Sequence, residues 1–152
     1  MKETKLHGRE AATYALIFDK TDEAMEELLL FARLHDIGAA HFTGIGAFSE
    51  VTLGYFDRGR KDYKKIWLPE QVEVLSLVGD IAREGGVPKV HAHVVVGKAD
   101  GTAHGGHLLE GRVWPTLELI LTESPHDLAR RSDPESGLAL IDLSKDDERR
   151  AA

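Results

Sequence analysis

One helical pattern followed by a long series of strand-forming segments is the feature that most limits the fold of this chain. Apolar residues recur at helical spacing within residues 22–36, namely Met25, Leu28, Leu29 and Ala32. Thr21 and Asp22 predict the start of this helix. From residue 39 onward the segments are short, rich in β-forming residues and punctuated by glycine. This order predicts an α+β domain with one main helix near the N-terminus, built on a strongly bent antiparallel sheet or a partial barrel.

The expected strands are spread over nearly the whole chain. They are residues 12–18, 39–49, 51–57, 62–68, 71–81, 89–97, 104–109, 114–122 and 137–143. Asp100-Gly101 predicts a hairpin turn between two of them. No repeat, low-complexity tract or linker interrupts the pattern. We therefore expect a single domain over residues 1–152, with a core from about 12 to 143 and a charged, frayed tail at 144–152.

Charge and composition argue against several classes of protein. The formal net charge is −7 and the sequence pI is about 5.6, which disfavours a broad nucleic-acid surface. The basic clusters at 58–65 and 130–131 are interpreted as solvated loop charges. The chain has no cysteine, so disulfides and thiolate metal sites are excluded. With no signal-peptide pattern and no apolar run of the roughly 18 residues that a membrane span needs, we expect a soluble, cytoplasmic protein.

The histidines of one predicted strand are the strongest indication of chemistry. In the segment 89–97, His91 and His93 share one face, while Val90, Ala92, Val94 and Val96 share the other. The Asp100-Gly101 hairpin brings the next strand alongside, and with it a third imidazole from His107 or His104. Gly105 and Gly106 permit either a bulge or the close approach of another backbone. We prefer His107 as the third ligand; three neutral imidazoles suit Zn²⁺ and leave a fourth position open.

Other polar residues are weaker candidates. Four of them could lie near the same pocket as partners of the ligands or as proton-transfer groups: Glu73, Asp80, Arg112 and Glu118. The isolated histidines are interpreted as surface or hydrogen-bonded side chains: His7, His35, His41 and His126. A glycine-rich phosphate loop before a helix is absent. The cupin metal pattern also begins with His-x-His but expects a carboxylate a few residues later, and residues 94–98 contain none.

Several blocks in this order resemble the PPC (plants and prokaryotes conserved) domain. They are Leu53-Gly54-Tyr55-Phe56-Asp57, residues 73–82, Val90-His91-Ala92-His93, and Gly105-Gly106-His107-Leu108 followed by Gly111. The resemblance covers residues 12–143 and implies a bent antiparallel sheet assembled as a homotrimer. In plants the domain follows AT-hook motifs, but the Arg-Gly-Arg-Pro core is absent here. Stand-alone prokaryotic members imply a metal on His91, His93 and His107; relatives more often have an apolar residue at the position of His104.

Three functional hypotheses follow. The first is a small homotrimeric Zn-binding protein whose open position holds water or a small anionic ligand, with its ligand and any reaction unidentified. The second is a regulatory or protein-interaction module that acts by self-assembly without catalysis and is associated with DNA, although the net charge disfavours direct binding. The third is a structural trimer in which the histidines are interface groups, so that it would dissociate near the histidine pKa range.

Overall fold

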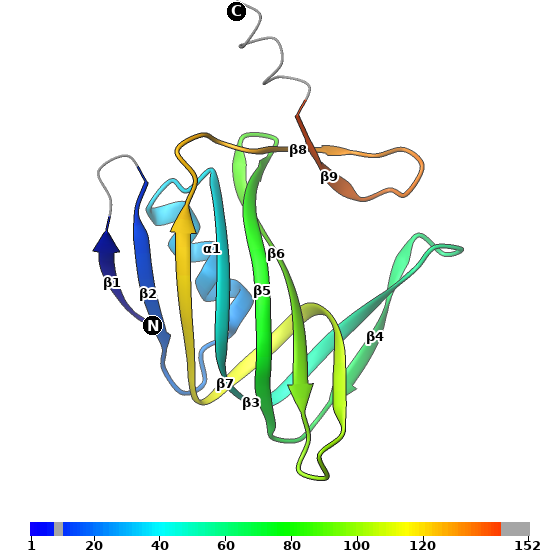
Figure 1. Cartoon of the computed structure of the whole chain (residues 1–152). Coiled ribbons are helices and arrows are strands. Elements are labelled where there is room, and N and C mark those ends of the chain that lie inside the picture. The colour runs from blue at the N-terminus through cyan, green and yellow to red at the C-terminus, as the bar shows by residue number, and fades with distance from the viewer. Residues whose placement is uncertain (8–10, 144–152) are drawn as a thin grey trace, which may run out of the picture.

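The computed structural model describes residues 1–7 and 11–143, so the expected tail at 144–152 lies outside the described residues (Figure 1). One helix and nine strands form in this part of the chain. They are β1 (Lys2–His7), β2 (Thr13–Phe18), α1 (Ala24–Leu34), β3 (Ala39–Asp57), β4 (Asp62–Leu68), β5 (Val72–Glu84), β6 (Val87–Gly97), β7 (Ala103–Glu123), β8 (Ala129–Ser132) and β9 (Ala139–Asp142). No helix in the described residues is long and apolar enough to cross a bilayer.

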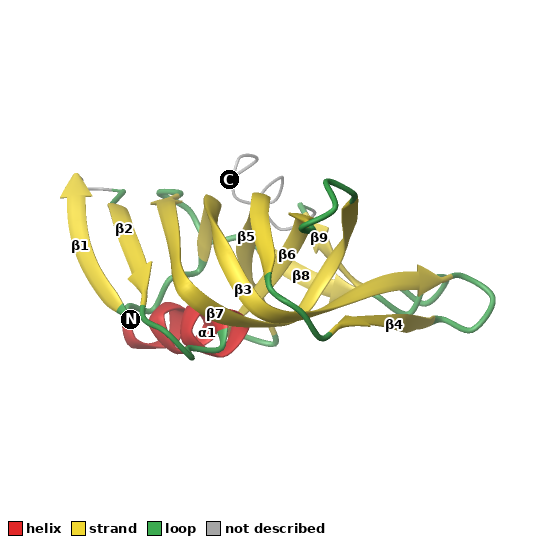
Figure 2. Ribbon diagram, turned by 90° about the horizontal axis from the view of Figure 1, so that it is seen from below, coloured by secondary structure: helices red, strands yellow, loops and turns green. Residues whose placement is uncertain are grey.

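All nine described strands belong to one strongly bent sheet. The strand order is β1-β2-β7-β3-β5-β8-β9, with β4 paired to β3 and β6 paired to both β5 and β7. Every pairing is antiparallel except the short parallel contact of β5 with β8. Figure 2 shows the sheet curving over α1 while β3 and β4 project as a two-stranded arm. The predicted bent antiparallel sheet with one helix is confirmed, and it does not close into a barrel.

Two strands are far longer than expected. β3 joins the segments predicted at 39–49 and 51–57, and β7 joins those at 104–109 and 114–122. The glycines bend these strands instead of ending them. At Gly46, for example, a Cβ would collide with the Thr116 carbonyl oxygen of β7, so glycine allows the two strands to stay paired through the bend. Strands β1 and β8 were not predicted.

The helix starts later than predicted because Glu23 is its N-cap. The Glu23 carboxylate accepts a hydrogen bond from the backbone N–H of Glu26 at 2.8 Å, so the regular helix begins at Ala24. Leu28, Phe31 and Ala32 then face the sheet and are buried against β6 and β7. The helix therefore covers one face of the sheet and leaves the opposite face open.

Candidate metal centre

Sheet register brings three histidines together on the open face. On β6 the residues alternate as predicted, with Ala92 and Val94 buried and His93 exposed. The hairpin places His107 of β7 directly opposite His93, and His91 lies two residues away on the same face. One ligand atom from each of the three imidazoles lies within 4.8 Å of the other two. Strand alternation and a two-stranded hairpin are thus sufficient to assemble the cluster.

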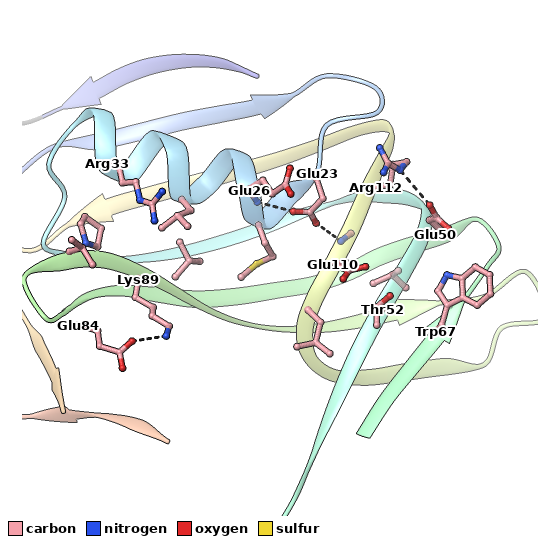
Figure 3. A pocket seen from close by; sticks show the side chains of 18 residues that line it. Glu23, Glu26, Arg33, Glu50, Thr52, Trp67, Glu84, Lys89, Glu110 and Arg112 are labelled. Carbon is pink, nitrogen blue, oxygen red and sulfur yellow. Dashed lines mark hydrogen bonds and ion pairs between the residues drawn. The ribbon is translucent and has the colours of Figure 1, made fainter. Parts of the chain in front are cut away.

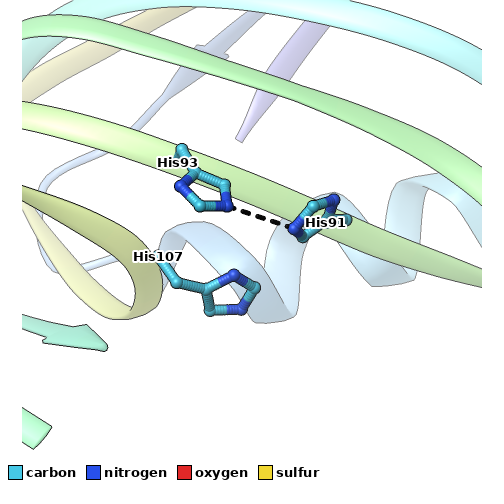
Figure 4. A group of neighbouring side chains, drawn as sticks. All are labelled: His91, His93 and His107. Atoms are coloured by element: carbon cyan, nitrogen blue, oxygen red, sulfur yellow. Dashed lines mark hydrogen bonds between the residues drawn. The ribbon is translucent and has the colours of Figure 1, made fainter. Parts of the chain in front are cut away.

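The separation between two ring nitrogens fits a tetrahedral ion. The Nε2 atoms of His91 and His93 are 3.2 Å apart, and the rings turn toward one another (Figure 4). Two nitrogen ligands of tetrahedral Zn²⁺, each about 2.0–2.1 Å from the ion, are separated by about 3.3 Å. The pair therefore needs almost no rearrangement to share one metal.

His107 carries a buried nitrogen without a hydrogen-bond partner among the described residues. This atom is Nδ1, and the ring is held between Tyr63, at 4.7 Å between centroids, and His91, at 5.2 Å. Burial, followed by the charges of His91 and His93, lowers the pKa of His107 to about 4. An imidazole kept neutral, with an unpaired nitrogen beside two other imidazoles, fits the requirements of a metal ligand.

A carboxylate and a guanidinium support the first of these histidines. Nδ1 of His91 lies 3.3 Å from Oδ2 of Asp80, its cross-strand neighbour on β5. The other oxygen of Asp80 forms a short ion pair with Arg130 of β8, whose side chain is only 8% exposed. Burial raises the pKa of Asp80, but the hydrogen bonds from His91 and Arg130 and the charge of Arg130 outweigh burial and lower it overall. Asp80 is therefore a charged partner for the His91 ring.

A protein-family model matches most of the chain. Residues 6–125 match the family model of the Plants and Prokaryotes Conserved (PCC) domain, also written PPC. The chain belongs to this family.

Several solved structures share the fold at 32–34% sequence identity. A PPC protein from Pyrococcus horikoshii is 34% identical, with a TM-score of 0.81 over 89% of this chain and 92% of that chain. A metal-containing protein from Archaeoglobus fulgidus is 32% identical, with a TM-score of 0.80 over 93% of this chain and 99% of that chain. A protein of Ralstonia eutropha JMP134 that is proposed to bind DNA is 34% identical, with a TM-score of 0.80 over 86% and 90%.

Curated relatives carry a similar segment within much longer proteins. Residues of this PCC domain are 32% identical over 123 positions to the bifunctional protein GlmU of Synechococcus sp. strain JA-3-3Ab, covering 79% of this chain. The chain spans only about a fifth of the length of the curated relatives it matches, 18% and 19% in the two GlmU proteins.

Of the other polar residues that the sequence suggested near the histidines, one contacts the cluster and the rest lie away from it. Asp80 contacts the cluster, whereas Glu73 lies opposite Gly97 at the far end of β5 and Glu118 lies on β7 beside Ile45. Arg112 also lies away from the histidines, because its guanidinium contacts Glu50 and the Thr21 carbonyl. His104 pairs with Val96 and is not part of the group of three.

The interpretation of 130–131 as solvated charges is wrong for one of the two arginines. Arg130 is buried against Asp80 and also donates to the Ala139 carbonyl at 2.9 Å, whereas Arg131 is exposed and pairs with Asp142. The burial of Arg130 depends on the parallel pairing of β5 with β8, which places Arg130 beside Glu84 of β5 and which the sequence does not indicate.

The two glycines before His107 form no bulge. Gly106 instead lies against the backbone of β3, where a Cβ would come 2.8 Å from the Gly54 carbonyl oxygen.

Two cavities flank β6. The larger, about 700 Å³, lies between α1 and the sheet and is rich in glutamates (Figure 3). Its lining includes two ion pairs, Arg112 with Glu50 at 3.4 Å and Lys89 with Glu84 at 2.5 Å. The smaller, about 240 Å³, is lined by His91 and His107. Only the smaller cavity therefore contacts the histidine cluster.

Proposed function

We propose that this PCC domain is a homotrimeric metal-binding protein that holds one Zn²⁺ on His91, His93 and His107. The observation that carries the proposal is the convergence of three imidazole nitrogens, one from each histidine, within 4.8 Å. The buried Nδ1 of His107, which has no hydrogen-bond partner among the described residues, is consistent with a ligand role for this imidazole. Three protein ligands leave a fourth position for water or a small anionic ligand.

The donor set favours zinc over Ca²⁺ and Mg²⁺. Ca²⁺ and Mg²⁺ prefer oxygen ligands, and no carboxylate belongs to the group of three. When bound, Zn²⁺ lowers the pKa of a bound water and polarises carbonyl or phosphoryl oxygens. The likeness to the metal-containing protein of Archaeoglobus fulgidus supports a resident metal. Asp80 would hold the His91 ring so that Nε2 is available, and Arg130 would hold Asp80.

Elemental analysis of the purified protein tests the metal directly. We expect about one zinc per chain, and loss of that zinc in the double variant His91→Ala/His93→Ala. Wild-type protein without stoichiometric metal, even after incubation with excess zinc and dialysis, would refute the proposal.

The open sheet face supports self-association, and the family resemblance gives the expected number of three chains. This face exposes several large apolar side chains, among them Ile45 at 61%, Val78 at 47% and Ile120 at 46%. Val78 is the direct cross-strand neighbour of His93, so an assembly on this face would adjoin the metal site. Sedimentation velocity should give a trimer at pH 7.5. If the histidines are instead interface groups without metal, acidification would dissociate the trimer and chelators would have no effect.

Association with DNA is the alternative function. It is favoured by the Ralstonia eutropha relative and by basic side chains on the projecting β3–β4 arm, namely Arg58, Arg60, Lys61, Lys64 and Lys65. The net charge of −7 opposes it. A gel-shift titration with duplex DNA at two salt concentrations tests direct DNA binding. We expect no shift, and a salt-sensitive shift would support the alternative.

A further inference from the structure

We propose that the 240 Å³ cavity beside the histidine cluster binds the aliphatic part of a small monoacid whose oxygen-bearing head occupies the open position of the metal. The proposal rests on the metal site proposed above. It adds the class of ligand and the residues that select it.

The position of the cavity relates it to the metal. His91 and His107 are two of the three expected ligands, and both also line this cavity. A molecule bound at the open position on the side of these two imidazoles therefore has the cavity directly beside it. Tyr63, whose ring stacks on His107, extends the wall away from the cluster.

The walls of the cavity are largely apolar and come from distant parts of the chain. Val90 of β6 lines one side, and Leu138, Ala139 and Leu140 at the start of β9 line the other. Residues 138–140 lie beyond the segment matched by the family model, which ends at 125. The start of β9 thus contributes aliphatic side chains to the cavity lining, which favour a ligand that carries an aliphatic group.

The charged residues of the lining are already neutralised. Arg130 pairs with Asp80, and Lys89 pairs with Glu84 at 2.5 Å. Neither cation is available for a second acidic group on the ligand without breaking its existing pair. The cavity is also smaller than the roughly 300–1,000 Å³ typical of drug-sized ligands, so a short chain is expected. A short aliphatic carboxylate, or a hydroxy or keto acid of that size, fits these constraints.

Binding of zinc-chelating probes of increasing length tests the proposal. Acetohydroxamate, butyrohydroxamate and hexanohydroxamate are titrated into the zinc-loaded protein by calorimetry. Because each buried methylene contributes about 0.8 kcal/mol, affinity should rise up to about fourfold per added methylene. Succinic monohydroxamate, which adds a second acid, should bind more weakly than butyrohydroxamate.

Variants of two exposed leucines test whether the chain-length dependence arises in this cavity. Leu140→Asp should flatten the chain-length dependence while zinc content stays unchanged, because Leu140 lines the cavity and does not belong to the group of three histidines. The control is Leu143→Asp, since Leu143 is 58% exposed and does not line the cavity; its chain-length dependence should match wild type. Leu140→Ala, which cannot disturb folding through charge, should give an intermediate dependence.

The outcomes separate this inference from the proposed function. If the wild-type protein binds zinc but affinity does not change with chain length, the cavity proposal is wrong and the metal site stands. Tighter binding of succinic monohydroxamate than of butyrohydroxamate would also overturn it. If the protein does not bind zinc, both proposals fail.

Discussion

Nδ1 of His91 lies 3.3 Å from Oδ2 of Asp80, and these two residues are direct neighbours across β5 and β6. The contact orients the ring so that the opposite nitrogen, Nε2, faces His93. A carboxylate in this position stabilises the tautomer that carries its proton on Nδ1 and increases the basicity of the other nitrogen. Asp80 is therefore the residue that orients one of the three proposed metal ligands.

Replacement of this carboxylate should weaken metal binding without removing a ligand. Asp80→Asn keeps the size of the side chain but removes its charge, so we expect zinc affinity to fall about 10–100-fold. Competition with a chromophoric chelator measures the change. Glu118→Gln is the matched control, because Glu118 is also a strand carboxylate and lies away from the histidines. Equal affinity of Asp80→Asn and wild type would show that Asp80 does not act on the metal.

Replacement of Arg130 should destabilise the fold far more than replacement of the adjacent Arg131. Arg130→Leu removes a buried guanidinium that holds both Asp80 and the Ala139 carbonyl, so we expect a loss of about 1.5–3 kcal/mol in the free energy of unfolding. Arg131→Leu removes an exposed charge and should change it by less than about 0.5 kcal/mol. Urea unfolding of the apoproteins compares the two. Similar losses in both variants would contradict the assignment of Arg130 as a buried support.

The choice between two histidines of β7 can be tested by metal content. His107→Ala should abolish retention of zinc after dialysis, because His107 is the cross-strand partner of His93 in the cluster. His104→Ala should retain about one zinc per chain, since His104 pairs with Val96 instead. The opposite result would move the third ligand to His104.

Much of this site was predictable because it depends on local periodicity. Alternation along β6 places His91 and His93 on one face, and the short Asp100-Gly101 turn fixes which residues of β7 lie opposite. Asp80 was among the candidates, although the sequence did not distinguish it from Glu73 or Glu118. The three are all strand carboxylates, and only the pairing of β5 with β6 places Asp80 beside His91.

The features that were missed depend on contacts between distant segments. Arg130 is separated from Asp80 by fifty positions and reaches it only through the parallel pairing of β8 with β5. The fusion of predicted strands into β3 and β7 has a similar origin. In a sequence, glycine indicates the end of a strand as readily as a bend within one. The reason for glycine at position 46 is the close approach of the Thr116 carbonyl oxygen of β7, which only the folded structure shows.

The open face of the sheet should be required for assembly. Ile45→Asp introduces a charge among the exposed apolar residues, so we expect the proposed trimer to dissociate into folded monomers. Leu34→Asp is the control, because Leu34 is 74% exposed at the end of the helix on the other side of the sheet. Sedimentation velocity measures the oligomeric state of each variant, and circular dichroism checks that each variant is folded. A trimer that survives Ile45→Asp would place the interface elsewhere.

The helix N-cap should make stability depend on pH in an identifiable way. Burial raises the pKa of the Glu23 carboxyl above its ordinary value of 4.5, although hydrogen bonds from Gly111 and Glu26 oppose the shift. The folded state therefore holds this proton more tightly than the unfolded chain. Its contribution to stability is fully present below about pH 4.5 and is lost as the pH rises through the raised pKa.

Glu23→Gln removes this titration and keeps one oxygen that can accept from the Gly111 N–H, which lies 2.7 Å from Glu23 in the wild type. The lost second oxygen weakens the cap at every pH by about 0.5–2 kcal/mol. The difference in free energy of unfolding, variant minus wild type, should nevertheless increase from pH 4 to pH 7. The control is Glu118→Gln, which removes a strand carboxylate opposite Ile45, and an equally steep change in this variant would mean that the pH dependence does not come from Glu23. A flat profile for Glu23→Gln over this range would mean that Glu23 ionises in the folded protein as it does in the unfolded chain.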